Sequence, residues 1–226
     1  MMPMVQWRGT FLCLVALAIA PQTTFAQQSA RPQVHGRVTD HVVVISIDGL
    51  RPDAIPKFKA PTLQRLMEEG RYSLSAQTIS LSLTLPAHVA MLSGVDADQH
   101  GITWNTDETR DEGYVRVPTI FSLARAAGFS TAAFFSKTKF HHLEVPKTLD
   151  YAWSPYGTVN AFYPPARTAD RVERYLRRAS PNLLFVHLAE PDFSGHRSGW
   201  MSSVYGRGVR AADVAVERIL KRADAQ

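Results

Sequence analysis

Polar residues that could bind a metal ion or a phosphoryl group stand at several places where an apolar run ends. The first is Asp48, which follows the run from Val42 to Ile47. The four consecutive β-branched residues that open this run predict a strand buried on both faces of a parallel sheet. Ligands gather beyond the carboxyl ends of such strands, so Asp48 is well placed to contact a metal or a ligand. A turn aspartate before Gly49 explains the same sequence, and both interpretations stay open.

A hydroxyl group stands at Thr84, two residues before Pro86, where we expect a helix to begin. The free backbone N–H groups and the positive end of the helix dipole at that place favour an alkoxide or a bound phosphoryl oxygen. An ordinary threonine N-cap is the alternative, and local sequence alone favours it.

Asp192 and His196 lie four residues apart, after the apolar segment 182–188. We expect them on a loop at the same sheet edge as Asp48, with Gly195 allowing a sharp turn. Carboxylate oxygen and imidazole nitrogen are ligands that suit zinc, although a solvated carboxylate beside an unrelated histidine stays possible. Asn105, in a polar loop, offers an amide that could donate to an oxyanion; a lone asparagine there is more often only a loop residue.

The elements that must position these residues alternate along the chain. The patterns predict strands over 42–47, 130–135 and 182–188, and a short strand that runs into a loop over 73–82. They predict helices over 61–70, 86–94, 118–128, 167–178 and 208–223. This alternation predicts an α/β fold: a doubly wound, mainly parallel sheet with helices on both faces. Residues 136–166 read as an irregular, aromatic-rich excursion.

The first 26 residues have the layout of a secretory signal peptide, with one charge at Arg8, a ten-residue apolar core from Phe11 to Ala20 and small residues up to Ala26. We therefore expect an exported protein, periplasmic or secreted, with a flexible lead-in over 27–40 and the domain over 41–226. The only cysteine, Cys13, lies in the segment to be removed. Disulfides and thiolate metal ligands are thus excluded from the expected mature chain.

Charge and hydropathy limit the partners. The full chain has 25 basic and 20 acidic residues; without Arg8 the mature chain keeps 24 basic ones, a net charge of +4. These basic residues are scattered, so we expect no nucleic-acid binding, whereas a small anionic substrate would be attracted. No segment after the signal peptide is long and apolar enough to suggest a membrane span.

The ordered motifs resemble the alkaline phosphatase superfamily, closest to its nucleotide pyrophosphatase/phosphodiesterase branch. They are Ile-Ser-Ile-Asp48-Gly-Leu-Arg-Pro-Asp, Thr84-Leu-Pro-Ala-His88 and Glu190-Pro-Asp192-Phe-Ser-Gly-His196. The resemblance extends over residues 42–199. It implies an alkaline-phosphatase-like fold and a hydrolase of phosphoric esters or anhydrides that uses two zinc ions.

The resemblance also implies a role for each residue. Thr84 is similar to the nucleophile that takes the phosphoryl group, bridged to the zinc ion that Asp48 helps to hold. Asp192 and His196 resemble ligands of the second zinc ion, and Asn105 the amide donor to a nonbridging oxygen. Zinc would lower the pKa of the hydroxyl, which is a poor nucleophile by itself.

Lys137 and Lys139 follow the strand expected over 130–135. In monoester- and phosphonate-cleaving members of the superfamily, basic residues of a comparable region contact terminal phosphoryl oxygens, so this pair favours such substrates. A pair of solvated loop lysines is an equally weighted alternative.

The resemblance does not include the C-terminal part of the family's pattern. Family members continue past the helix expected over 208–223 into a strand that ends in an Asp-His pair, with a further histidine later. Each expected zinc site here has two protein ligands, where catalytic zinc usually has three. A catalytically inactive, truncated remnant or an anion-binding domain of the same fold is therefore the alternative to an active hydrolase.

Overall fold

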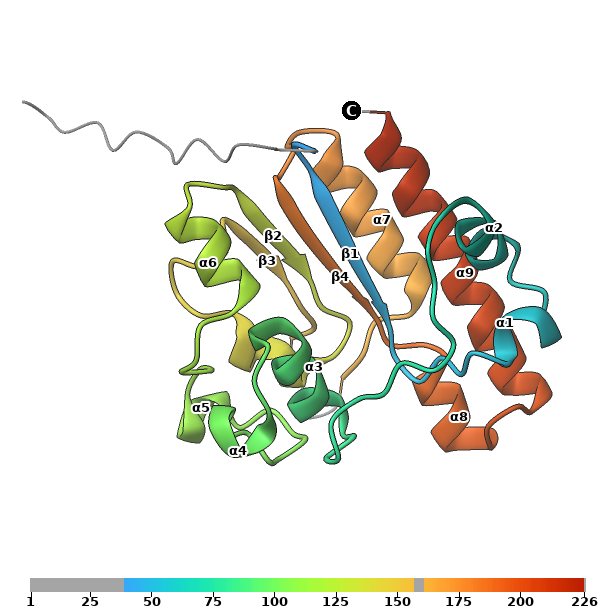
Figure 1. Cartoon of the computed structure of the whole chain (residues 1–226), viewed down its shortest axis with the longest axis horizontal. Coiled ribbons are helices and arrows are strands. Elements are labelled where there is room, and N and C mark those ends of the chain that lie inside the picture. The colour runs from blue at the N-terminus through green and yellow to red at the C-terminus, as the bar shows by residue number, and fades with distance from the viewer. Residues whose placement is uncertain (1–38, 157–160, 226) are drawn as a thin grey trace, which may run out of the picture. The chain divides into compact units, whose positions relative to one another are not determined.

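One parallel sheet organises the part of the chain that the computed structural model describes, residues 39–156 and 161–225 (Figure 1). Within these residues the sheet has four strands in the order β1-β4-β2-β3, and each pairing is parallel. The strands are β1 (Val42–Ile47), β2 (Thr131–Phe134), β3 (Tyr151–Trp153) and β4 (Leu183–Leu188). The predicted α/β class is confirmed.

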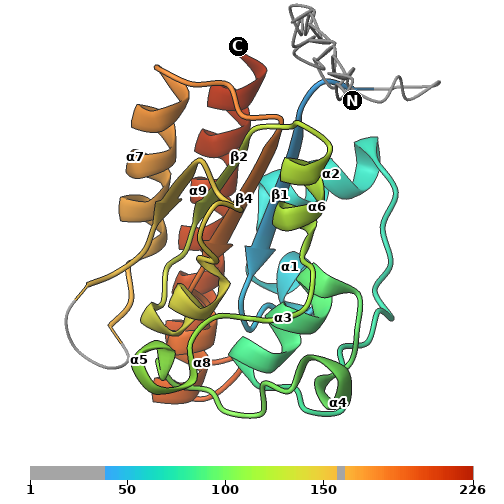
Figure 2. The same ribbon diagram turned by 90° about the vertical axis from the view of Figure 1, so that its left-hand side faces the viewer.

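Helices cover both faces of the sheet, as Figure 2 shows from the side. The helices α7 (Pro165–Leu176) and α9 (Ser203–Asp224) pack on one face, whereas α3 (Thr84–Ser93) and α6 (Ile120–Ala126) pack on the other. The remaining helices are short: α1 (Ala54–Lys57), α2 (Pro61–Glu69), α4 (Ala97–His100), α5 (Thr109–Glu112), the 3-10 helix η1 (Thr138–Leu143) and α8 (Asp192–Ser198).

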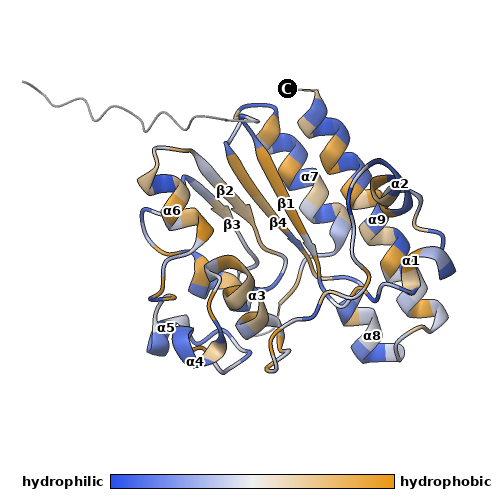
Figure 3. Cartoon of the chain, viewed as in Figure 1, coloured by the Kyte–Doolittle hydropathy of each residue, from blue (hydrophilic) through white to orange (hydrophobic). Residues whose placement is uncertain are grey.

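Alternate residues of β4 enter two different hydrophobic cores. Leu184 and Val186 face the core shared with α7 and α9, and Phe185 faces the core shared with α3 and α6. Burying such a side chain stabilises the fold by roughly 1.5–3 kcal/mol. Figure 3 shows β1 and β4 as largely apolar strands, beside helices that carry both apolar and polar residues. The sheet is thus held from both sides, which fixes the edge where its strands end.

Most predicted elements are present with ends shifted by a few residues. The largest shift is in α9, predicted from residue 208 but beginning at Ser203, because the Ser202 hydroxyl accepts a hydrogen bond from the Tyr205 N–H at 3.2 Å and caps the helix earlier. The helix predicted from Pro86 begins two residues earlier, at Thr84.

Two strand predictions were wrong. Residues 73–82 alternate polar and apolar side chains, but they form an extended, mostly exposed segment without a strand partner among the described residues. Conversely, β3 lies inside the stretch predicted to be irregular. It is only three residues long, and its pairing with β2 rather than any periodicity of its own makes it a strand.

The predicted signal peptide and nearly all of the predicted lead-in lie outside the described residues. Among the residues that are described, none of the helices is long and apolar enough to cross a membrane.

A buried carboxylate on α9 caps the start of α2. The Oδ2 atom of Asp213 accepts a hydrogen bond from the Thr62 N–H at 3.2 Å, and its Oδ1 atom accepts one from the Leu63 N–H at 2.9 Å. Residue 60, the N-cap position of α2, is an alanine with no polar side chain. A residue about 150 positions away in the chain therefore supplies the capping oxygens and ties α2 to α9.

We predict that Asp213→Ala lowers the free energy of unfolding by about 2 kcal/mol, because it leaves two helix-end N–H groups without an acceptor. Asp213→Asn keeps one carbonyl oxygen as an acceptor, so it should lower the free energy of unfolding by less. Urea unfolding followed by circular dichroism measures both. Arg210→Ala, an exposed change on the same helix, is the control and should leave the midpoint of urea unfolding unchanged. An equal shift in the control would show that the effect belongs to α9 in general.

Candidate active site

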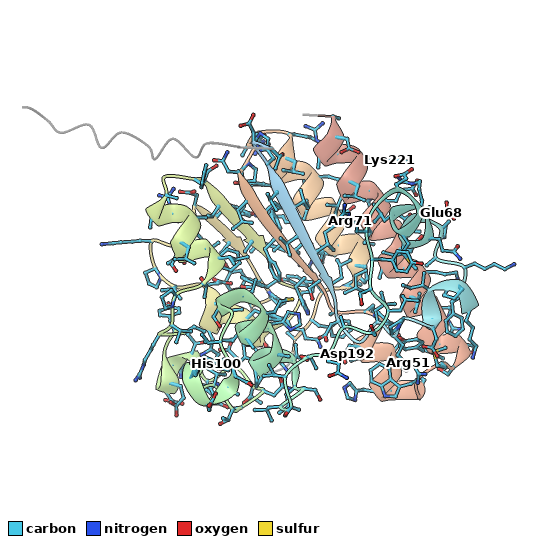
Figure 4. All side chains as sticks on the ribbon, viewed as in Figure 1. Arg51, Glu68, Arg71, His100, Asp192 and Lys221 are labelled. Carbon is cyan, nitrogen blue, oxygen red and sulfur yellow. The ribbon has the colours of Figure 1, made fainter. Side chains whose placement is uncertain are left out.

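The pairing of β1 with β4 places two carboxylates side by side. The Asp48 N–H donates to the Leu188 carbonyl at 3.0 Å, and the Asp192 N–H donates to the Asp48 carbonyl at 2.9 Å. Asp192, labelled in Figure 4, lies beyond the carboxyl ends of the strands. Both side chains are largely buried, with 12 % and 14 % of their surfaces exposed. The backbone itself therefore sets their separation.

Gly49 makes this close approach possible. Its φ angle is +70°, and a Cβ atom at this position would lie 2.5 Å from the Cα atom of Asp192. A side chain would thus both strain the left-handed backbone and push α8 away.

The Thr84 hydroxyl points toward these carboxylates. Thr84 is the first residue of α3, and Leu83 is its N-cap residue, so the N-cap interpretation of Thr84 was wrong. The hydroxyl donates to Asp48 Oδ2 at 3.2 Å. Asn105 meets the same helix start, where its Oδ1 atom accepts from the Leu85 N–H at 2.9 Å. The oxygen of the Asn105 side chain thus binds α3, and its amide nitrogen is the end of the side chain that can donate a hydrogen bond.

Lys137 carries the positive charge of the cluster. Its Nζ atom lies 2.5 Å from Asp48 Oδ2, 2.6 Å from Asp192 Oδ2 and 3.4 Å from Thr84 Oγ1. Lys139, two residues on, is 8 % exposed. Both lysines are therefore enclosed, and the interpretation as solvated loop lysines was wrong.

The charges of this cluster shift several pKa values. Burial opposes ionisation of Asp48, but the His187 imidazole beside it and the charge of Lys137 outweigh this effect and hold the pKa of that carboxyl well below its ordinary range. Burial, and next the nearby Lys137 ammonium, lower the pKa of Lys139 to about 8. At neutral pH the site therefore holds an ionised Asp48 and a Lys139 that is close to its titration point.

His187 and His88 lie beneath the carboxylates and are neutral. Burial lowers the pKa of His187 to about 3 and also lowers that of His88. The Nδ1 atom of His187 accepts from the Ser136 N–H at 3.4 Å, so its Nε2 atom carries the proton and faces Asp48 Oδ2 at 3.4 Å. The contact of His187 with Asp48 depends on the β1–β4 register, which the sequence does not show.

His196 stands at the mouth of the site. Its Nε2 atom lies 3.4 Å from Asp192 Oδ1, and its side chain is 73 % exposed. The predicted loop is in fact the helix α8, whose one-turn spacing brings the two residues together. Gly195 serves packing rather than a turn, because a Cβ atom there would lie 2.4 Å from the Trp200 ring.

Two hollows meet at this cluster. A cavity of about 240 Å³ is lined by residues from five parts of the chain: Thr84, Asn105, Lys137, Lys139, Phe162, Asp192, Phe193 and His196. An open groove of about 1040 Å³ shares Thr84, Asn105, Asp192 and His196 with it and extends along residues 76–79 to Met91 and Trp200. All seven predicted site residues therefore line one or both hollows. Residues 76–79 were missed because they carry no chemical motif.

Two other histidines that could have completed a metal site lie elsewhere. His141 Nδ1 lies 2.5 Å from Asp107 Oδ2, and the buried His142 accepts from the Glu108 N–H at 3.0 Å and bonds to the Gly113 carbonyl at 2.6 Å. Neither lines the hollows around Thr84.

The donor set suits a cation between Asp48, Thr84 and Asp192, since the Lys137 ammonium lies there among three oxygen atoms. Carboxylate and hydroxyl oxygens also bind divalent metals. Within residues 39–156 and 161–225, however, no group of three His, Cys, Asp or Glu side chains converges on one point. The described residues thus fit one cation at the position of the Lys137 ammonium. Asp192 and His196 are the pair of side chains that comes nearest to forming a second cation site.

The sheet, the threonine at a helix start and the paired carboxylates are what the sequence motifs led us to expect of a phosphoryl-transfer site. A family model of type I phosphodiesterase/nucleotide pyrophosphatase matches residues 42–226. The chain belongs to this family.

Two curated proteins illustrate the relationship. The bis(5'-adenosyl)-triphosphatase of Xenopus laevis is 25% identical over 174 residues, which are 71% of this chain and 38% of that protein. The human ectonucleotide pyrophosphatase/phosphodiesterase family member 5 is 24% identical over 208 residues, 85% of this chain and 41% of that protein. The chain thus spans about two fifths of the length of these relatives.

A solved structure shares the fold. It is murine ectonucleotide pyrophosphatase/phosphodiesterase 5, in an inactive threonine-to-alanine form in complex with AMP. The TM-score is 0.67 at 20% identity, over 83% of this chain and 53% of that one.

We predict that Gly49→Ala destabilises the protein more than Gly94→Ala. Both glycines have φ angles near +70°, but among the described residues nothing lies within 4 Å of a Cβ atom at Gly94. Gly94→Ala should lower the free energy of unfolding by only roughly 1–2 kcal/mol, which is what an alanine in the left-handed conformation costs. Gly49→Ala should lose about 1–3 kcal/mol more, because the methyl group meets the Asp192 backbone. Urea unfolding of both variants measures the difference; equal losses would contradict the close approach of β1 and α8.

Proposed function

We propose that this chain carries out metal-dependent hydrolysis of phosphoric esters or anhydrides, of phosphodiesterase/nucleotide pyrophosphatase type, with Thr84 as the nucleophile. The observation that carries the proposal is the Thr84 hydroxyl, which lies at the start of α3 against Asp48 and 3.4 Å from a buried ammonium. Family membership supports the reaction class. The signal-peptide pattern of residues 1–26 supports export, periplasmic or secreted.

Asp48 orients the hydroxyl rather than deprotonating it. Its pKa lies well below the ordinary range, so it is a weak base. A threonine hydroxyl needs positive charge nearby to become an alkoxide. The residues that would hold zinc are Asp48, Thr84, Asp192 and His196. When bound, zinc would lower the pKa of the hydroxyl and stabilise negative charge on the phosphoryl group.

Several groups of the chain are placed to bind an anionic phosphoester. The start of α3 presents the Thr84 N–H and the positive end of the helix dipole, which favour phosphate, whereas the Leu85 N–H already donates to Asn105 and Pro86 has no N–H. Asn105 can donate its amide from the wall of the cavity, and Lys137 and Lys139 line the same cavity. The two lysines favour a doubly charged terminal phosphoryl group over a singly charged diester.

The larger groove is suited to the rest of such a substrate. It continues from Thr84 past Met91 to Trp200, two large apolar side chains that are about half exposed. An aromatic and apolar surface next to a phosphate site suits a nucleoside. The relatives support this choice: one is named for splitting a dinucleoside triphosphate, and another was solved with AMP.

The second candidate is a catalytically inactive remnant or anion-binding domain of the same fold. It is favoured by the lack of three converging metal ligands in the described part of the chain. This candidate keeps the anion-binding groups but lacks turnover, so activity and binding measured on the same protein distinguish the two.

We predict that Thr84→Ala abolishes hydrolysis of bis(p-nitrophenyl) phosphate and p-nitrophenyl phosphate, by about 10³-fold or more in kcat, while AMP still binds. The assays contain added zinc, and isothermal titration calorimetry measures AMP binding. Thr78→Ala, in the same groove but away from the carboxylates, is the matched control and should keep wild-type activity.

The outcomes separate the hypotheses. Activity retained by Thr84→Ala would show that another group attacks. Binding of AMP by a wild-type protein without any turnover would support the anion-binding alternative.

We also predict that AMP binding weakens as the pH rises above about 8. Lys139 has a pKa of about 8, so it is charged below this pH and loses its charge above it. AMP stays dianionic above about pH 7, so the change belongs to the protein. The dissociation constant should rise by up to about tenfold per pH unit. Lys139→Arg, which keeps its charge, should flatten the profile between pH 7.5 and 9.5; an unchanged profile in this variant would assign the titration to another group.

A further inference from the structure

Lys137 is fixed in the site by its backbone. It follows β2 and forms an isolated antiparallel bridge with Phe162. On either side, the Thr138 N–H donates to the Ala161 carbonyl at 3.2 Å, and the Tyr163 N–H donates to the Ser136 carbonyl at 2.9 Å. These backbone bonds therefore direct the Lys137 side chain into the site.

The ammonium lies between two carboxylates that would otherwise repel each other, and it offsets one of their two negative charges. Because Asp48 Oδ2 and Asp192 Oδ2 both contact Nζ, these two oxygens lie at most 5.1 Å apart. Two ionised carboxylates that close and that buried need a positive charge between them. Lys139 is nearby but has no hydrogen bond to either of them among the described contacts.

The same position suits a divalent metal. Carboxylate oxygens also bind zinc and magnesium, so a divalent ion held by Asp48 or Asp192 would need the oxygen atoms that now contact the ammonium. An ammonium and a metal ion cannot occupy the position together. One must leave before the other binds.

We infer that Lys137 is a tethered cation that competes with the divalent metal for Asp48 and Asp192 and so sets the metal affinity of this chain. The metal binds only to the fraction of molecules in which the ammonium has moved away, which weakens the observed affinity by that fraction. The 240 Å³ cavity, which Lys137 also lines, is the space into which the ammonium moves.

This competition deepens the proposed function. In the displaced position the ammonium faces the cavity that would hold the phosphoryl group, next to Lys139 and Asn105. The lysine thus has two partners in turn, the carboxylates before the metal binds and the substrate anion afterwards. This second step rests on the proposed function, whereas the competition itself does not.

The test is zinc binding by isothermal titration calorimetry on the full chain after removal of metal by chelator and dialysis. Lys137→Met keeps the length of the side chain and removes its charge. It should bind one zinc ion about tenfold or more tighter than the wild type, which corresponds to an ammonium in place in at least about nine molecules out of ten.

Three variants give the controls. Lys139→Met removes an equally enclosed charge of the same cavity and should change zinc affinity much less. Lys137→Arg keeps the charge and should not gain affinity. The double variant Asp48→Asn with Lys137→Met should lose the gain in zinc affinity. That loss would show that the zinc ion binds at the carboxylates.

The inference is overturned if Lys137→Met and the wild type bind zinc within twofold of each other, or if Lys139→Met gains as much. If Lys137→Met does not fold without metal, zinc in the refolding buffer should restore it at one ion per chain, and failure with zinc present would also overturn the inference. Because no turnover is measured, the outcome is independent of the Thr84→Ala assays.

Discussion

The separation of Asp48 and Asp192 is the constraint on which the site depends. It is set by backbone contacts: β1 pairs in register with β4, and the Asp192 N–H then bonds to the Asp48 carbonyl. Gly49 permits this contact because it has no Cβ atom to strike α8. Hydrophobic layers on both faces of the sheet hold the strands in place, so the carboxylates are positioned by the whole core rather than by their own side-chain bonds. A site built on strand ends in this way is rigid before any ligand arrives.

The electrostatic consequences follow from that separation. Two largely buried carboxylates at most 5.1 Å apart between their Oδ2 atoms require a cation, and Lys137 supplies one. The same ammonium helps to keep Asp48 ionised, and it lowers the pKa of Lys139. His187 adds a hydrogen-bond donor below Asp48 without adding charge, since burial keeps it neutral. The result is a site whose groups differ in proton affinity although they lie close together, as is typical of functional sites.

The sequence predicted the fold and the list of site residues better than it predicted their surroundings. The runs that became β1 and β4 are apolar, that of β1 is also β-branched, and proline and glycine mark helix ends, so these elements could be recognised locally. β3 could not, because its three residues become a strand only through β2. The motif around Asp192 was predicted to lie on a loop but forms the helix α8. Gly195 suggested a turn, whereas the Trp200 ring against it explains the glycine. The contacts of Lys137 and His187 depend on long-range register, and no local pattern contains that information.

The position of Lys137 also bears on how metal binding relates to folding. In many small metal sites the ligands repel one another until the ion arrives, so metal binding and folding are a single event. Here a cation of the same chain already lies between the carboxylates and offsets part of their charge, and the layers around the sheet do not involve them. Folding should therefore proceed without metal, and the metal has to displace existing ion pairs. The same arrangement serves both candidate functions: it preserves a folded anion-binding site when no metal is present, and it leaves the threonine hydroxyl beside the position where a metal would activate it.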